Sequence, residues 1–102
     1  MEEVYIVIRH SYVWQSGCAY FRTTDIVSLF GNAEEAKEGM LNDVTKKKHE
    51  FETDKTEDYR LDYETTRDLE SELCYLDTNG IAYEYKWSID IYEVKGKTEW
   101  KN

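Results

Sequence analysis

The chain has 102 residues, of which 40% are hydrophobic and 15% aromatic, and its formal net charge is −9. This length fits one domain with a sizeable core, and the aromatic content excludes a disordered acidic chain. The negative charge and the lack of a basic stripe argue against direct nucleic-acid binding and against binding to an anionic membrane.

The amino-terminal run MEEVYIVIRH lacks the basic region and the long apolar core of a signal peptide. No other stretch approaches the roughly 20 apolar residues of a membrane span. Without a secretion signal, Cys18 and Cys74 are interpreted as reduced thiols, so we expect a cytoplasmic protein. We also expect a single domain over residues 1–94 and a flexible tail over residues 95–102.

The first expected element is a strand over residues 3–14, where side chains alternate at strand spacing. Residues 4–8 are apolar on both faces, which is typical of a central strand. The turn residues Gln15-Ser16-Gly17 follow, and a second strand ends in the apolar run 26–30. The pattern therefore predicts a long hairpin over residues 3–30.

A helix is expected over residues 32–50. Asn32 can cap its first turn, and Glu35 stands at the returning position of a capping box. Acidic residues fill the first turns and Lys46 to Lys48 the last, which matches the helix dipole at both ends. An apolar stripe at helical period is formed by Ala33, Ala36, Met40, Leu41 and Val44.

The segment after this helix carries conflicting patterns. A mobile loop is expected over residues 52–58, followed first by strand-like and then by helix-like spacing. The strand-like positions are Tyr59, Leu61 and Tyr63, and the helix-like positions are Leu69, Leu73 and Leu76. Asn79-Gly80 favours a type I′ hairpin turn between residues 73–77 and 81–94. Gly80 could instead end a short helix over residues 66–77.

The last strand, residues 81–94, has one aromatic and aliphatic face and one polar face. We expect the first face to pack and the second to be wet. The packed set is Ile81, Tyr83, Tyr85, Trp87, Ile89 and Ile91, and the wet set is Ala82, Glu84, Lys86, Ser88, Asp90 and Tyr92. The predicted fold is α+β, an antiparallel sheet of about four strands with one main helix on one face, in the order β-β-α-β-β.

No catalytic or metal-binding motif is visible. His10 continues the face of the first strand and is interpreted as structural. Residues 77–80 resemble part of a calcium loop, but Tyr75 and Lys86 would then occupy positions that require carboxylates. We therefore expect a non-enzymatic protein with no cofactor and no metal.

Negative charge is concentrated between Glu50 and Glu72, where ten acidic residues face only three basic ones. Such a field can attract a cationic partner. We expect a basic protein surface to bind this segment through Glu57, Asp58, Asp62 and Glu64. The alternative is a solvated connecting region with no binding role.

Aromatic residues cluster around the tip of the first predicted hairpin. They are Tyr12, Trp14, Tyr20 and Phe21. Tyrosine and tryptophan at an exposed tip are typical of interface anchors, so these residues are a second expected partner-binding site. The alternative is that they only extend the hydrophobic core.

Three runs, VYIVIRHSYVW, DIVSLFGNAEEAKEGMLNDV and WSIDIYEVKG, resemble small uncharacterised α+β proteins of bacteriophages and prophages. The resemblance covers about 45 of the 102 residues, and the chain departs from it in the long acidic insert between Glu50 and Tyr75. It implies an accessory or host-interaction role.

The leading functional hypothesis is a small acidic protein-binding module that acts through the acidic segment and the aromatic hairpin tip. One alternative is a homo-oligomer whose aromatic strands pair with themselves. The other is an inhibitor that mimics nucleic acid, with carboxylates in place of phosphates.

Overall fold

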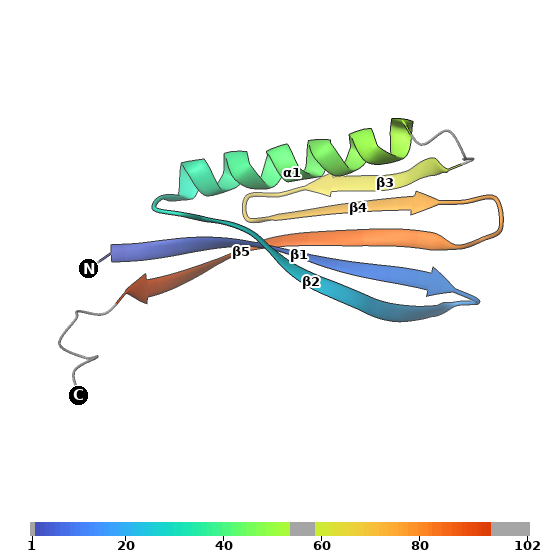
Figure 1. Cartoon of the computed structure of the whole chain (residues 1–102), viewed down its shortest axis with the longest axis horizontal. Helices are drawn as coiled ribbons and strands as arrows, with labels where there is room; N and C mark the ends of the chain where they lie inside the picture. Colours follow the sequence, from blue (N-terminus) through green and yellow to red (C-terminus); the bar gives the residue numbers. More distant parts are fainter. Residues whose placement is uncertain (1, 54–58, 95–102) are drawn as a thin grey trace.

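The computed structural model describes residues 2–53 and 59–94, which form five strands and one helix (Figure 1). In chain order the elements are β1 (Glu2–Gln15), β2 (Cys18–Phe30), α1 (Ala33–Thr53), β3 (Arg60–Thr66), β4 (Glu70–Leu76) and β5 (Ala82–Val94). The strands form one antiparallel sheet in the order β2-β1-β5-β4-β3. The α+β prediction is confirmed, with five strands in place of about four.

The long amino-terminal hairpin is confirmed. β1 and β2 pair from Tyr5 opposite Phe30 to Gln15 opposite Cys18. The turn between them places Ser16 and Gly17 at positive φ, 56° and 78°. β1 lies between β2 and β5, so it is paired on both sides, as its two apolar faces predicted, although β5 is the middle strand of the sheet.

β2 contains two β-bulges. The pairing with β1 shifts by one residue twice, which leaves Arg22 and Val27 without a partner on β1. A bulge bends its strand and changes the direction of a side chain. Val27 packs against the core, and Arg22 faces the same side of the sheet as α1, where it lies near Lys47 and Tyr85.

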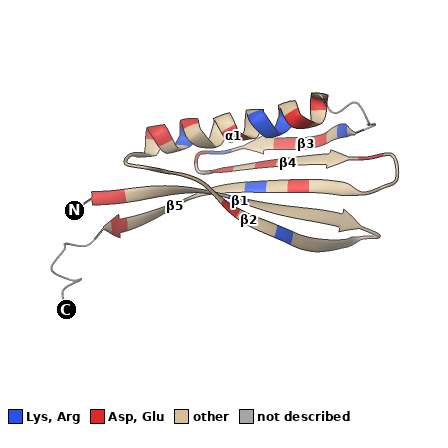
Figure 2. Ribbon diagram, in the orientation of Figure 1, with Lys and Arg blue, Asp and Glu red and all other residues tan. Residues whose placement is uncertain are grey.

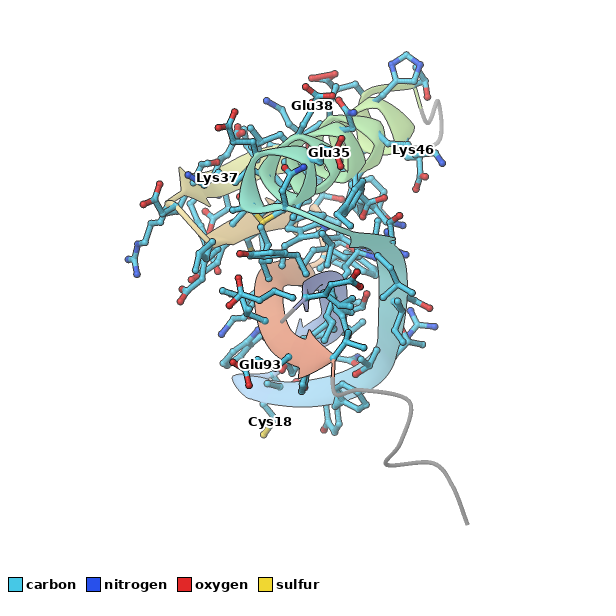
Figure 3. The ribbon with its side chains drawn as sticks, turned by 90° about the vertical axis from the view of Figure 1, so that its left-hand side faces the viewer. Cys18, Glu35, Lys37, Glu38, Lys46 and Glu93 are labelled. Carbon is cyan, nitrogen blue, oxygen red and sulfur yellow. The ribbon has the colours of Figure 1, made fainter. Side chains whose placement is uncertain are left out.

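The predicted cap begins α1 as expected, because Asn32 Oδ1 accepts a hydrogen bond of 2.8 Å from the Glu35 amide. Ala36, Met40 and Val44 are buried, whereas Leu41 of the predicted stripe is exposed. Figure 3 shows α1 along one side of the curled sheet. The buried residues of the core are Val7, Ala36, Met40, Val44, Leu73, Tyr75, Trp87 and Ile89.

The predicted end of the helix was wrong. α1 continues to Thr53, so residues 52 and 53 of the expected loop are helical, and residues 54–58 lie outside the described residues. Its last turn contains no basic residue. Lys47 and Lys48 instead form ion pairs with Glu50 and Glu64, so these lysines balance acidic side chains rather than the helix dipole.

The favoured hairpin around Asn79-Gly80 is confirmed, since β4 and β5 form it, and the alternative helix over residues 66–77 is wrong. β4 pairs with β3 on one side and β5 on the other, which satisfies its backbone as a strand. β3 is the additional strand, and Asp62 forms a bulge in it because the register shifts between Leu61 and Tyr63. The spacing of Leu69, Leu73 and Leu76 therefore did not indicate a helix.

The β4–β5 loop differs from a two-residue type I′ turn. Gly80 has the predicted positive φ of 83°, but Asn79 is not among the described residues with positive φ. The Asp77 carboxylate instead accepts hydrogen bonds from the amides of Asn79 and Ile81, both at 2.9 Å. The backbone closes the same loop, through Asp77 N–H to the Ile81 carbonyl at 2.9 Å and Gly80 N–H to the Asp77 carbonyl at 3.2 Å, so backbone and side chain together fix a longer turn.

The two faces of β5 are only partly as predicted. Trp87 and Ile89 are buried under α1, but Ile91 is exposed. Glu84, expected on the wet face, is buried. Within the described part of the chain, no helix has the length and the low charge that a membrane crossing needs.

Candidate functional site

The predicted acidic site is only partly visible. Glu57 and Asp58 lie outside the described residues. Asp62 is exposed at the bulge of β3. Glu64 faces α1 and forms an ion pair of 2.9 Å with Lys48, so part of its charge is balanced within the molecule.

Other acidic residues near this site also have basic neighbours. Glu50 pairs with Lys47 and Asp68 with Lys37, each at 3.1 Å. Figure 2 shows these blue and red segments mixed along α1 and β3. Exposed ion pairs stabilise a fold little, but they reduce the field available to a partner. On β3, an edge strand, charged side chains also discourage pairing with another chain.

The structure brings together only part of the predicted aromatic site. The rings of Tyr12 and Phe21 meet edge to face at 5.7 Å between centroids, on the side of the sheet opposite α1. We call this side the open face. Tyr20 pairs with Val13 and lies on the side that carries α1. β2 and β3 form opposite edges of the sheet, which separates Tyr20 and Phe21 from the acidic residues of β3.

Trp14 has a partner within the molecule. Its indole Nε1 donates a hydrogen bond of 2.9 Å to Glu84, and the Tyr63 hydroxyl donates to the other oxygen of that carboxylate. A buried carboxylate needs such donors, and these two hydrogen bonds explain how Glu84 can be buried. Because Trp14 is still 39% exposed, it combines this structural contact with an accessible ring edge.

Cys74 lies beside Glu84 on the open face and is buried, whereas Cys18 is exposed at the hairpin tip and points away from α1 (Figure 3). Burial raises the pKa of the Cys74 thiol, and the nearby charge of Asp62 raises it further. Both cysteines are free, as predicted. The protonated, buried Cys74 is a poor nucleophile.

The open face also carries a hydrophobic surface, of which only Phe21 was identified from the sequence. Phe21, Ile26 and Leu29 of β2 are 59%, 67% and 60% exposed. They lie opposite half-buried residues of β1, in the pairs Tyr12 with Phe21, Ile8 with Ile26 and Ile6 with Leu29. We call Phe21, Ile26 and Leu29 the apolar row. The bulges interrupt the two-residue spacing of the apolar row along β2. The apolar run 26–30 was therefore interpreted only as the end of a strand.

A second missed feature is a small polar hollow of about 190 Å³ on the side of the sheet that carries α1. Arg9, Arg22 and Lys47 line it, from β1, β2 and α1 respectively. Burial lowers the pKa of Arg9, but hydrogen bonds and charges from Asp43 and Asp25 outweigh this and raise it above its ordinary value. The Arg9 guanidinium therefore stays charged.

The described residues show no arrangement of the kind that holds a metal ion, since no three histidine, cysteine or acidic side chains gather within them. His10 Nδ1 forms a hydrogen bond of 2.8 Å with the Thr24 hydroxyl. This contact fits the structural interpretation of His10.

Comparison with known proteins adds no functional assignment. No protein-family model, curated protein or solved structure matches the chain. The resemblance to small phage and prophage proteins therefore stays a prediction.

Proposed function

We propose that the chain is a non-enzymatic protein-binding module, and that its partner contacts the open face of the β1–β2 hairpin. The observation that carries this proposal is the apolar row. Three large side chains more than half exposed on one face of one edge strand form a patch of the kind that marks an interaction site. The adjacent rings of Tyr12 and Trp14 extend it toward the tip.

The charges around the apolar row indicate a partner with a basic rim. No Asp, Glu, Lys or Arg occurs over residues 10–21, so the outer part of the hairpin is largely uncharged (Figure 2). Beyond it, the neighbouring strands present Glu70, Glu72 and Asp90 on the open face, against Lys86. The chain's net charge of −9 would speed the approach of such a basic partner.

A photoreactive benzophenone side chain at position 26, introduced into the full chain in its native cell, tests this function. The matched control is the same group at Leu41, an apolar residue of α1 that is also exposed. We expect a discrete crosslinked protein from position 26 and none from position 41. Identical products from both positions, or a crosslink only to a second copy of the chain, would contradict the proposal.

The crosslinked partner then allows a direct affinity measurement. Combining Ile26→Ser with Leu29→Ser should weaken binding about tenfold or more, because a hydrophobic interface loses its central contacts. Leu41→Ser should leave the affinity unchanged. Equal affinities for these two variants would remove the apolar row from the interface.

A further inference from the structure

The polar hollow brings three cationic side chains together in a strongly acidic protein. Arg9, Arg22 and Lys47 come from three different elements, and Asp25 is the acidic residue among the described residues that line the hollow. The bulge in β2 is what turns Arg22 toward this side of the sheet. Basic side chains thus outnumber the acidic one in the lining of the hollow. Arg9 is also paired with Asp43, and Lys47 with Glu50, so Arg22 is the lining cation that has no ion pair among the described residues.

Two of these cations have hydrogen-bond donors that no described residue uses. The terminal nitrogens of Arg9 donate hydrogen bonds to Asp43 at 2.6 Å and to Asp25 at 3.2 Å, but its buried Nε has no partner. Arg22 forms no ion pair with any residue of the described ranges. A buried donor without an acceptor costs free energy, but Arg9 Nε is closed to solvent. Arg22 is exposed, so its guanidinium donors are the ones that an anion in the hollow can reach.

Lys47 completes the cationic side of the hollow. Its ammonium group lies 5.1 Å from the centroid of the Tyr85 ring and 3.1 Å from Glu50. Burial and the charge of Glu50 raise the pKa of Tyr85, while the charges of Arg9 and Arg22 lower it. Tyr85 lines the hollow together with both arginines. The hydroxyls of Ser11 and Thr23 also line the hollow.

A second hollow of about 360 Å³ adjoins the first. Both are lined by Val13, Arg22 and Tyr83, and the second also by Tyr20 and Ile81. The first is smaller than the roughly 300 to 1,000 Å³ of a typical whole-ligand site, so it suits a single group, whereas the second falls within that range. Arg22 therefore lines both the hollow that contains Arg9 and Lys47 and the hollow that contains Tyr20.

We propose that the two adjoining hollows bind a small phosphate monoester with a flat aromatic body, as in a nucleoside monophosphate. The phosphate would lie against Arg22, Arg9 and Lys47, and the aromatic body against Tyr20 and Tyr83. A phosphate monoester carries about −1.5 to −2 charge and three acceptor oxygens, which suits three cations better than a single carboxylate. This site lies on the opposite side of the sheet from the apolar row, so it is independent of the proposed protein-binding function.

Asp25 would compete with the phosphate. Its half-exposed carboxylate accepts from Arg9 Nη2 at 3.2 Å and from the Thr23 hydroxyl at 3.4 Å. A dianion in the hollow would meet repulsion from this charge. Asp25→Asn should therefore tighten phosphate binding, an effect opposite to that of removing a cation.

Titration of the full chain with adenosine monophosphate, inorganic phosphate or adenosine, at constant ionic strength and monitored by amide chemical shifts, tests the proposal. We expect the nucleotide to bind about tenfold or more tightly than either fragment, with shifts at Arg22 and Tyr83. Equal affinity for nucleotide and phosphate would overturn the aromatic half of the site. Equal affinity for nucleotide and adenosine would overturn the cationic half.

Variants locate the site. Arg22→Ala should weaken nucleotide binding about tenfold or more, Asp25→Asn should strengthen it, and Tyr20→Ser should reduce it to the affinity of inorganic phosphate. Arg60→Ala is the matched control, because Arg60 is an exposed arginine of the opposite edge strand. If Arg22→Ala lowered the melting temperature, Arg22→Gln would replace it. Nucleotide affinity that responds equally to the Arg22 and Arg60 changes would exclude this site.

Discussion

Arg9 and Asp43 form an ion pair of 2.6 Å that joins the interior strand β1 to α1. The side chains are only 17% and 10% exposed, and the same Asp43 oxygen accepts a hydrogen bond of 2.8 Å from the Trp87 indole. One carboxylate thus attaches the helix to two strands of the sheet. It is a mostly buried polar contact beside the hydrophobic core that α1 forms with the sheet.

Asp43→Ala should therefore destabilise the fold by about 3 kcal/mol, because it leaves the buried Trp87 indole N–H without its acceptor and the mostly buried Arg9 guanidinium with Asp25 alone. Denaturant unfolding measures the change. Glu38→Ala, at an exposed position that points away from the sheet (Figure 3), is the control and should alter stability by less than about 0.5 kcal/mol. A similar small effect at Asp43 would contradict the structural role of this ion pair.

Gly39 lies where α1 passes over Phe30 of β2, and a Cβ on Gly39 would overlap the Phe30 ring. In an open helix position, glycine to alanine stabilises by about 1 kcal/mol. We expect Gly39→Ala to be destabilising instead, since the ring must move out of its packed position. In a Phe30→Leu background the same substitution should cost less or become stabilising, and a double-mutant cycle of unfolding free energies measures the difference. Additive effects would show that the two residues do not compete for space.

The two cysteines should react at very different rates with a thiol reagent. Cys18 is exposed, whereas Cys74 is buried and its thiol pKa is raised by burial and by Asp62. Mass spectrometry should show one rapid modification in the native protein, at Cys18, and a second only after denaturation. Cys18→Ser should remove the rapid phase. Fast labelling of Cys74 in that variant would mean that the open face is more accessible than the structure shows.

Stability should fall at alkaline pH through Tyr75. Burial, with smaller contributions from Glu52 and Glu64, raises its pKa from 10.0 to about 12. The folded state therefore holds the phenol proton more tightly than the unfolded state, so this contribution is complete below pH 10 and is lost as the pH rises toward 12. Urea unfolding between pH 8 and 11 measures the decline, and Tyr75→Phe should make it shallower. An unchanged slope in that variant would assign the decline to other tyrosines.

The elements with local signals could be predicted from the sequence. Asn32 caps α1 through its own side chain, and Gly80 takes the positive φ that its turn requires. β3 was harder to predict because its bulge at Asp62 changes the side to which later residues point. Leu61 pairs with Tyr75 and so faces the side of the sheet that carries α1, whereas Tyr63 reaches Glu84 on the open face. A spacing of two residues normally places side chains on the same face.

The candidate sites depend on contacts between distant residues. Glu84 could not be recognised as buried, because its two donors, Trp14 and Tyr63, are 70 and 21 residues away in the chain. The cationic hollow likewise combines side chains from three elements and depends on the bulge that turns Arg22. No short motif records either arrangement.

The position of β5 has a consequence for synthesis of the protein on the ribosome. The hairpins β1–β2 and β3–β4 each form from neighbouring residues, and β5 is the strand that pairs with both of them in the sheet. It pairs along its length with β1, the earliest of the five strands in the chain, from Glu2 opposite Val94 to Trp14 opposite Ala82. Until β5 emerges, the inner edge of β1 has no partner and is open to pairing with other nascent chains. The sheet can therefore close only after β5 has been synthesised, and its completion is a slow step because it pairs residues that are far apart in the chain.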